Sequence, residues 1–215
     1  MADEGVLLAI DTASPSPAVA LLDRGAVFEE ALPSDRRASE DLLPAIHRCL
    51  TRAGAALGRV SRIAVCAGPG SFTGLRVGLA TAWGLGRAAG IPIESVSTLE
   101  AMAEAWRESG EGRVWAALDA GKGELVTQEF DLGAARALPR APARRAPAAE
   151  ARTAAGELPV VSLPPALLPG ASSPRRSLAR ALALASARAP RPPATGAGLP
   201  IYARASAAEE KHGAA

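Results

Sequence analysis

The chain has 215 residues, of which 48% are hydrophobic and only 3% aromatic, and its formal net charge is +2. This length can bury a substantial core in one domain or two small lobes, whereas the low charge and few aromatic residues argue against nucleic-acid binding by the chain alone. No uncharged apolar run is long enough to span a membrane, and Asp3 and Glu4 do not fit a signal peptide. We therefore expect a cytoplasmic protein.

Three strands are predicted at the start of the chain. Residues 6–10 are all apolar, residues 18–22 form a second apolar run, and Asp23-Arg24-Gly25 turns this run into a third strand at residues 26–30. Three consecutive strands joined by short turns favour an antiparallel meander.

A helix is expected next, over residues 39–54. Ser39 is its predicted N-cap, acidic residues follow in its first turn, and Gly54 ends it. Its apolar positions recur at helical spacing and share one face. These positions are Leu42, Leu43, Ile46 and Leu50.

A strand, a glycine turn and a second helix follow, over residues 62–66, 68–74 and 74–89. The turn would place backbone N–H groups and hydroxyls at a helix N-terminus, where an anion could bind. It lacks the lysine of a phosphate-binding P-loop and the third glycine of a dinucleotide fingerprint, so a purely structural turn remains an alternative. The weak candidates for binding a cofactor here are Gly68, Gly70, Ser71 and Thr73.

The second helix carries small residues at every fourth position, which form one ridge along it. Such a ridge permits close packing, either against a helix of a partner or against the chain's own sheet, and the sequence leaves both alternatives open. The ridge residues are Gly74, Gly78, Ala82 and Gly86.

The rest of the chain is less regular. A short strand is expected near Ile93, and Ser97-x-x-Glu100 has the pattern of a capping box at the start of a helix. Further on, we expect a hairpin over residues 113–130, loop or weak helix over residues 133–156, and a strand at residues 159–161. An amphipathic helix over residues 177–188, with Leu178, Leu182 and Ala185 facing inward, precedes a linker at residues 190–200.

Few residues could carry chemistry. Asp11 ends the first strand and could hold a metal, or equally could cap backbone N–H groups of its own loop. His47 and His212 lie far apart in sequence and do not form a metal-binding pair, and no Ser-His-Asp or Cys-His set can be assembled. Cys49 and Cys66 are isolated in apolar contexts, typical of reduced, buried thiols.

The segment Gly68-Pro69-Gly70-Ser71-Phe72-Thr73-Gly74-Leu75-Arg76-Val77-Gly78, followed by Ser97-Thr98-Leu99-Glu100-Ala101, resembles the TsaB (YeaZ) family of tRNA threonylcarbamoyladenosine biosynthesis proteins. The resemblance is strongest from about residue 7 to residue 100. Pro200-Ile201-Tyr202-Ala203-Arg204 also resembles the family's closing motif. The chain departs from the family's pattern at Ala38, where the family usually has histidine, and at residues 119–126, where a tyrosine is lost.

The resemblance implies an α/β fold of the two-lobed, actin-like ATPase type (ASKHA, ribonuclease H-like). Residues 1–100 would form an N-terminal lobe of order βββαβαβα, and residues 101–215 a smaller, reduced and degenerate lobe. The second lobe lacks the Asp-x-Gly-Gly phosphate loop and the glycine pair that hold a nucleotide in such ATPases. We therefore expect no ATPase, kinase or peptidase activity of the isolated chain.

The implied function is that of a non-catalytic scaffold for synthesis of N6-threonylcarbamoyladenosine in tRNA. It would bind TsaD-type and TsaE-type proteins, meet tRNA only through that complex, and form a homodimer when alone. No cofactor is expected in the isolated chain, whereas ATP or ADP and a metal are expected in the partner complex. The alternative is an actin-like phosphotransferase or glycoprotease-type peptidase that acts alone through Asp11 and the glycine loop. The expected partner interface comprises Leu42, Leu43, Ile46, Gly74, Arg76, Gly78, Ala82 and Gly86.

Overall fold

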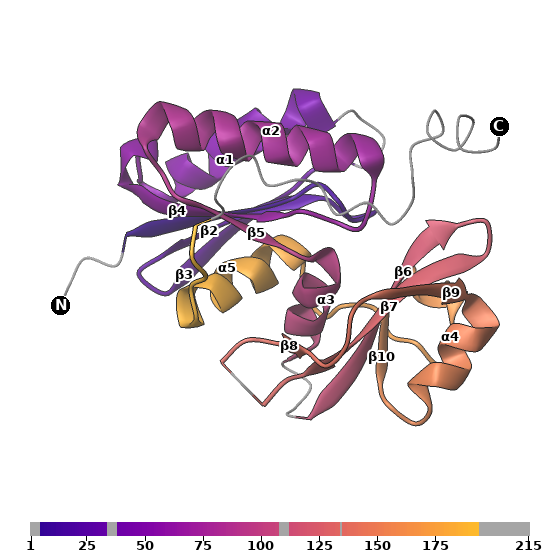
Figure 1. The fold of residues 1–215 in the computed structure, drawn as a ribbon. Coiled ribbons are helices and arrows are strands. Elements are labelled where there is room, and N and C mark those ends of the chain that lie inside the picture. Colours follow the sequence, from indigo (N-terminus) through magenta and orange to yellow (C-terminus); the bar gives the residue numbers. More distant parts are fainter. Residues whose placement is uncertain (1–4, 34–37, 108–111, 134, 194–215) are drawn as a thin grey trace.

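A computed structural model describes residues 5–33, 38–107, 112–133 and 135–193, and they form two five-stranded sheets. The first sheet is built from residues 6–96 and the second from residues 113–163 (Figure 1). The α/β fold expected from the sequence is confirmed. The division into lobes at residue 100 and the reduction of the second lobe stay predictions.

The first sheet has the strand order β3-β2-β1-β4-β5. The three opening strands pair as the expected antiparallel meander, while β4 and β5 run parallel to β1. The order of strands and helices in this half matches the predicted βββαβαβα, with a short 3₁₀ turn at Leu57–Arg59 before β4. The strands are β1 (Val6–Asp11), β2 (Ala18–Asp23), β3 (Ala26–Ala31), β4 (Val60–Cys66) and β5 (Ile93–Val96).

Helices cover both faces of this sheet (Figure 1). α1 (Ala38–Ala53) and α2 (Phe72–Ala89) lie on one face, and α5 (Leu178–Arg188) lies on the other. Because side chains alternate along a strand, odd and even positions of β1 join different cores. Val6, Leu8 and Ile10 pack with α1 and α2, whereas Leu7 and Ala9 pack toward α3 (Thr98–Trp106) and α5.

The second sheet has the order β10-β6-β7-β8, with β9 also paired to β7. The predicted hairpin is present as β6 and β7, and Lys122 and Gly123 turn between them with positive φ. The helix α4 (Ala148–Ala155) packs on this sheet. The strands are β6 (Arg113–Gly121), β7 (Glu124–Asp131), β8 (Leu138–Pro139), β9 (Arg144–Pro147) and β10 (Val160–Leu163), and a 3₁₀ turn at Pro165–Leu167 follows β10.

The two sheets share one core. α3 and α5 lie between them (Figure 1), and the same buried cluster contains Leu7 of β1, Met102 of α3, Phe130 of β7 and Leu182 of α5. α5 therefore packs on the first sheet although it comes from the second half of the chain. Its inward residues are those predicted, and Ser177 caps it by accepting a hydrogen bond from the Arg180 N–H at 3.0 Å.

Three local expectations are wrong. α1 begins at Ala38, so Ser39 lies inside the first turn and does not cap it. Ser97 precedes α3, but its side chain makes no capping hydrogen bond. Glu100 accepts hydrogen bonds from arginine side chains instead of closing a capping box. Residues 133–156 were expected to be loop or weak helix. The helix α4 agrees with this expectation, whereas the strands β8 and β9, which pair with β7, contradict it.

Some expectations fall outside the described residues, namely those at Asp3, Glu4, Tyr202, Arg204 and His212. Within the described ranges, no helix is both long enough and apolar enough to cross a lipid bilayer.

Candidate functional site

Two loops meet at the carboxyl ends of β1 and β4, where an actin-like enzyme would bind phosphate. The Ser71 N–H donates to the Ala13 carbonyl at 2.9 Å, and the Thr12 hydroxyl donates to the Gly74 carbonyl at 2.6 Å. A Cβ atom on Gly70 would lie 2.3 Å from the Ala13 carbonyl oxygen. The loops are thus packed directly on each other, and a glycine is required at position 70 by this contact.

Asp11 is fully buried at the end of β1. Its carboxylate accepts hydrogen bonds from the Ala13 N–H at 2.9 Å, the Ser14 N–H at 3.2 Å and the Ser14 hydroxyl. Burial raises the pKa of Asp11 above its usual 3.8, and the bonds from Ser14 and Ala13 oppose this shift. Of the two roles considered for Asp11, the structure shows the cap of its own loop.

Several donors of these loops are used within the chain. The Ser16 N–H donates to the Ser14 hydroxyl at 3.3 Å, and the Gly74 N–H donates to the Ser71 hydroxyl at 3.2 Å. Ser71 is thereby the N-cap of α2, and Gly68 accepts from the Thr98 N–H at 2.8 Å. Thr73 is exposed at the helix start, and the role of these residues as a cofactor site stays a prediction. The described residues also contain no group of three or more potential metal ligands.

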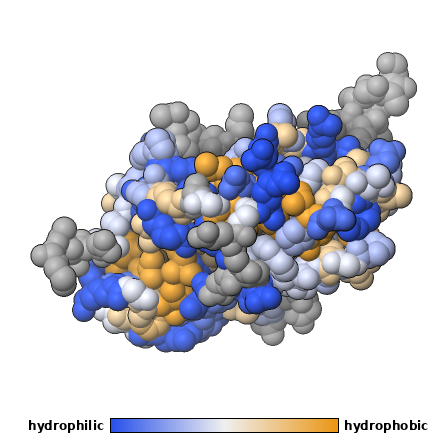
Figure 2. Space-filling model, turned by 90° about the horizontal axis from the view of Figure 1, so that it is seen from below, coloured by the Kyte–Doolittle hydropathy of each residue, from blue (hydrophilic) through white to orange (hydrophobic). Residues whose placement is uncertain are grey.

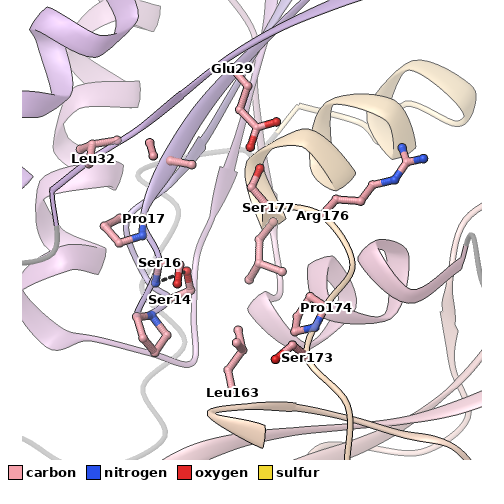
Figure 3. A pocket seen from close by; sticks show the side chains of 14 residues that line it. Ser14, Ser16, Pro17, Glu29, Leu32, Leu163, Ser173, Pro174, Arg176 and Ser177 are labelled. Carbon is pink, nitrogen blue, oxygen red and sulfur yellow. Dashed lines mark hydrogen bonds between the residues drawn. The ribbon is translucent and has the colours of Figure 1, made fainter.

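A cavity of about 440 Å³ lies beside these loops, between β3, the loop after β1 and the start of α5. Figure 3 shows that it is lined by serine and proline side chains, while the Arg176 side chain extends away from the labelled serines along α5. The one bond drawn between its walls joins Ser16 to Ser14. The cavity is therefore weakly polar and presents no cluster of cations to a phosphate.

The small-residue ridge of α2 faces the chain itself. A Cβ on Gly74 would lie 1.9 Å from the Thr12 carbonyl oxygen, one on Gly78 would lie 2.3 Å from the Thr12 hydroxyl, and one on Gly86 would lie 2.6 Å from Ile93. Ala82 is fully buried in the same core. Of the two alternatives for the ridge, packing against the chain's own sheet is correct, and the expectation that Gly74, Gly78, Ala82 and Gly86 meet a partner is wrong.

The other expected interface residues divide into two groups. Leu42 and Ile46 are buried against the first sheet, so their assignment to a partner surface is also wrong. Leu43 is 55% exposed on α1, and Phe72, which the sequence analysis had not selected, is 37% exposed at the start of α2. The guanidinium carbon of Arg76 lies 3.7 Å from the centre of the Phe72 ring.

Among the described residues, the histidine and the two cysteines belong to no group of potential metal ligands. His47 is exposed on α1. Both cysteines are buried and reduced, as expected. Burial raises the pKa of Cys49 to about 11, with the charge of Glu30 adding to the shift. Burial, followed by the charge of Asp11, raises the pKa of Cys66 well above 9. Neither thiol is ionised as a nucleophile requires.

A buried ionic cluster was missed by the sequence analysis. Arg136, beyond β7, donates to Glu94 on β5 and, at 3.0 Å, to Glu100 on α3. Glu104, one turn further along α3, accepts from Arg107 at 2.8 Å and from Arg188 at the end of α5. The signal available in the sequence was a pair of glutamates four residues apart on an otherwise apolar helix, which predicts a buried carboxylate pair.

The chain was compared with known proteins. The family model described as TsaD, tRNA N6-adenosine threonylcarbamoyltransferase, matches residues 31–143. The tRNA threonylcarbamoyladenosine biosynthesis protein TsaB of Escherichia coli is 42% identical over 125 residues, which cover 58% of this chain and 54% of the relative. TsaB of Bacillus subtilis is 35% identical over 122 residues, or 56% and 53% of the two chains. The chain thus spans about half the length of the curated relatives it matches.

Solved structures give the same result over more of the chain. A protein described as similar to peptidase YEAZ from Pseudomonas aeruginosa has a TM-score of 0.74 and 28% identity, and the match covers 93% of this chain and all of that chain. YeaZ from Pseudomonas aeruginosa has a TM-score of 0.62 and 34% identity, with 66% and 67% of the two chains covered. The chain therefore belongs to the TsaB/YeaZ family and shares the fold expected from its glycine-loop motif.

Proposed function

We propose that this chain is a non-catalytic supporting subunit of the assembly that makes N6-threonylcarbamoyladenosine in tRNA, and that it binds a TsaD-type protein. Its relatives are named as tRNA threonylcarbamoyladenosine biosynthesis proteins, and the family model of the transferase itself matches about half of the chain. Two proteins of one fold family can pair through equivalent helices, which suggests the form of the complex.

The observation that carries the proposal is the outer face of α1 and α2. Leu43 and Phe72 are two of the large apolar side chains that the described residues leave exposed, and each lies near the N-terminal end of its helix. α1 and α2 cover the same face of the first sheet (Figure 1). Arg76 stacks on Phe72 and holds an aromatic and a cation together at the surface. Aromatic and arginine side chains are enriched among residues that dominate binding energy.

The loops at the carboxyl ends of β1 and β4 support a role without catalysis. Asp11 is enclosed by donors from its own loop, and four backbone N–H groups of the two loops, those of Ala13, Ser14, Ser16 and Gly74, are bonded within the chain. Opening the loops would leave these buried groups unpaired, at about 1–3 kcal/mol for each. ATP or ADP and the metal would accordingly be bound by the partner proteins rather than here.

We propose that the same surface also serves the wider assembly. A TsaE-type protein would join the complex, tRNA would be met through the complex, and the chain alone would form a homodimer through α1 and α2 in the cytoplasm. The residues after 100, apart from α5, which packs on the first sheet, would form the smaller, reduced lobe, and this leaves the first lobe to make the contacts.

The experiment is a calorimetric titration of the intact chain with the TsaD-type protein of the same organism. The double variant Leu43→Glu/Phe72→Glu places two charges in the proposed contact, and we expect it to weaken binding at least about thirty-fold, the loss typical of a central contact residue. Leu138→Glu is the matched control, because Leu138 is also half exposed but lies on β8 of the second sheet. Equal affinity of the double variant and the control would refute the assignment of the interface.

A further inference from the structure

A second cavity, of about 500 Å³, lies at the other end of α5 from the serine-lined cavity. It is formed where β1 and β4 begin, where β2 turns into β3, and where α5 ends. Seen from below, the molecule has an apolar patch at this end, bordered by hydrophilic residues (Figure 2). The lining residues used below are Leu7, Leu22, Arg24, Arg62, Leu184 and Arg188.

The floor of this cavity is apolar. Leu7 of β1 pairs with Leu22 of β2 on one side and with Arg62 of β4 on the other, so the three side chains form one row across the sheet. Leu184 of α5 also lines the apolar part of the cavity. A row of this kind accepts one apolar side chain, and burying that side chain fully would contribute about 1.5–3 kcal/mol.

The walls of the cavity are positively charged. Arg24, Arg62 and Arg188 line it, and no aspartate or glutamate does so among the described residues. Arg188 donates to Glu104, so its charge is compensated within the chain. Glu94, the carboxylate nearest to Arg62, already accepts from Arg136 and Ser186. The excess of positive charge in the cavity therefore comes from Arg24 and Arg62.

The contacts of two of these arginines are long. Arg24 Nε lies 3.6 Å from Asp23, and Arg62 Nη1 lies 3.9 Å from Glu94, beyond hydrogen-bonding distance in both pairs. Arg62 also donates to the Arg191 carbonyl at 3.0 Å. Since a guanidinium has five N–H donors, both side chains retain capacity to bind a ligand's carboxylate.

The arginines are spread apart rather than gathered at one point. Arg24 follows β2 and Arg62 lies on β4, with β1 between them. Two strand spacings separate their backbones by about 10 Å. This separation corresponds to about three residues of an extended peptide. It therefore suits carboxylates on either side of one apolar residue better than a single phosphate, which would need converging cations.

We propose that this cavity binds an acidic peptide segment of a partner protein, with one apolar side chain of the peptide on the floor and carboxylates on either side of it. The site lies on the face of the first sheet opposite to α1 and α2. The cavity is thus separate from the surface proposed for the TsaD-type protein. If the peptide does not bind here, the proposed function of the chain is unaffected.

The test is fluorescence anisotropy with the intact chain and a labelled peptide of sequence Asp-Glu-Leu-Asp-Glu. The matched probe Asn-Gln-Leu-Asn-Gln keeps the leucine and removes the charge. Arg24→Glu is a mild change for the fold, because the Arg24 side chain is 73% exposed, and we expect it to weaken binding of the acidic peptide at least ten-fold. Arg87→Glu, an exposed position of α2 on the other face of the sheet, should change it less than two-fold.

Several results would overturn the proposal. One is equal binding of the acidic and the neutral peptide, and another is equal sensitivity to Arg24→Glu and Arg87→Glu. Tighter binding of a synthetic peptide of residues 199–210 of this chain, with the same loss in Arg24→Glu, would assign the cavity to the chain itself. Sedimentation showing a dimer that Arg24→Glu dissociates would assign it to a second copy. Absence of binding of either peptide to the intact chain would also overturn it.

Discussion

Replacing Gly78 by alanine should destabilise the protein, whereas the same replacement at Gly84, on the same helix, should stabilise it. A Cβ at position 78 would lie 2.3 Å from the Thr12 hydroxyl, which donates to the Gly74 carbonyl at 2.6 Å. A Cβ at position 84 would meet nothing within 4 Å. The pair isolates packing of the ridge from helix propensity.

The magnitudes follow from three effects. Both replacements gain about 1 kcal/mol of helix propensity. At position 78 the extra methyl group overpacks a filled site at a cost of about 1–3 kcal/mol, and displacing the Thr12 hydroxyl loses a hydrogen bond of about 0.5–1.5 kcal/mol. The net change is a loss of about 0.5–3.5 kcal/mol for Gly78→Ala and a gain of about 1 kcal/mol for Gly84→Ala.

Thermal melting measures both variants against the unmodified chain. For a domain of this size, 1 kcal/mol corresponds to a change in Tm of about 2–4 °C, so the two variants should move in opposite directions. If Gly78→Ala melted at the temperature of the unmodified chain or above it and instead lost association with a partner, the packing of the ridge on Thr12 would be refuted.

Three further predictions concern buried groups. The raised pKa of Asp11 removes stability as pH rises from 3.8 toward its folded-state value. Asp11→Asn should therefore gain stability relative to the unmodified chain as the pH of a denaturant titration is raised above 3.8, and a difference that stays constant with pH would contradict the shift. Asp11→Ala should lose about 1–3 kcal/mol for each donor left unpaired. Arg136→Met removes the guanidinium that joins the buried Glu94 and Glu100, which keep Ser186 and Arg191 respectively as hydrogen-bond donors. It should lose up to about 3–5 kcal/mol in the same assay, against less than about 1 kcal/mol for the half-exposed Arg140→Met; similar losses would show that the cluster contributes little. Burial raises the pKa of Cys49 to about 11 and the pKa of Cys66 well above 9. We therefore expect neither thiol to react with iodoacetamide at pH 8 until denaturant is added. Modification of the folded chain would refute the burial of these thiols.

The regular part of the fold was predictable because its signals are local. Apolar runs bounded by turn residues gave all five strands of the first sheet, and small residues at every fourth position of α2 indicated a close contact. The direction of that contact depends on Thr12, which is 62 residues away from Gly74 in sequence and bonds to it only in the folded chain. Spacing along one helix cannot supply this information.

The candidate sites show the same limit. Ser71 and Gly70 have the composition of an anion-binding turn, but the Ser71 N–H donates to the Ala13 carbonyl, which packs directly on Gly70. The interface residues were chosen by apolar periodicity, which selects the buried face of α1 and so led to Leu42 and Ile46. Leu43 was counted in the same periodic pattern, yet it is exposed, and Phe72 was not selected at all; the structure shows that both side chains lie at the surface.

The central claim is that this chain supports catalysis by its partners through the outer face of α1 and α2, and that Asp11 takes no part in the chemistry. It is tested most directly by measuring threonylcarbamoyladenosine formation on tRNA with purified TsaD-type and TsaE-type proteins, ATP and an activated threonylcarbamoyl donor. We predict that Asp11→Asn supports the reaction as well as the unmodified chain, and that Leu43→Glu/Phe72→Glu loses most of it. Full activity with the double variant and none with a folded Asp11→Asn would contradict the account.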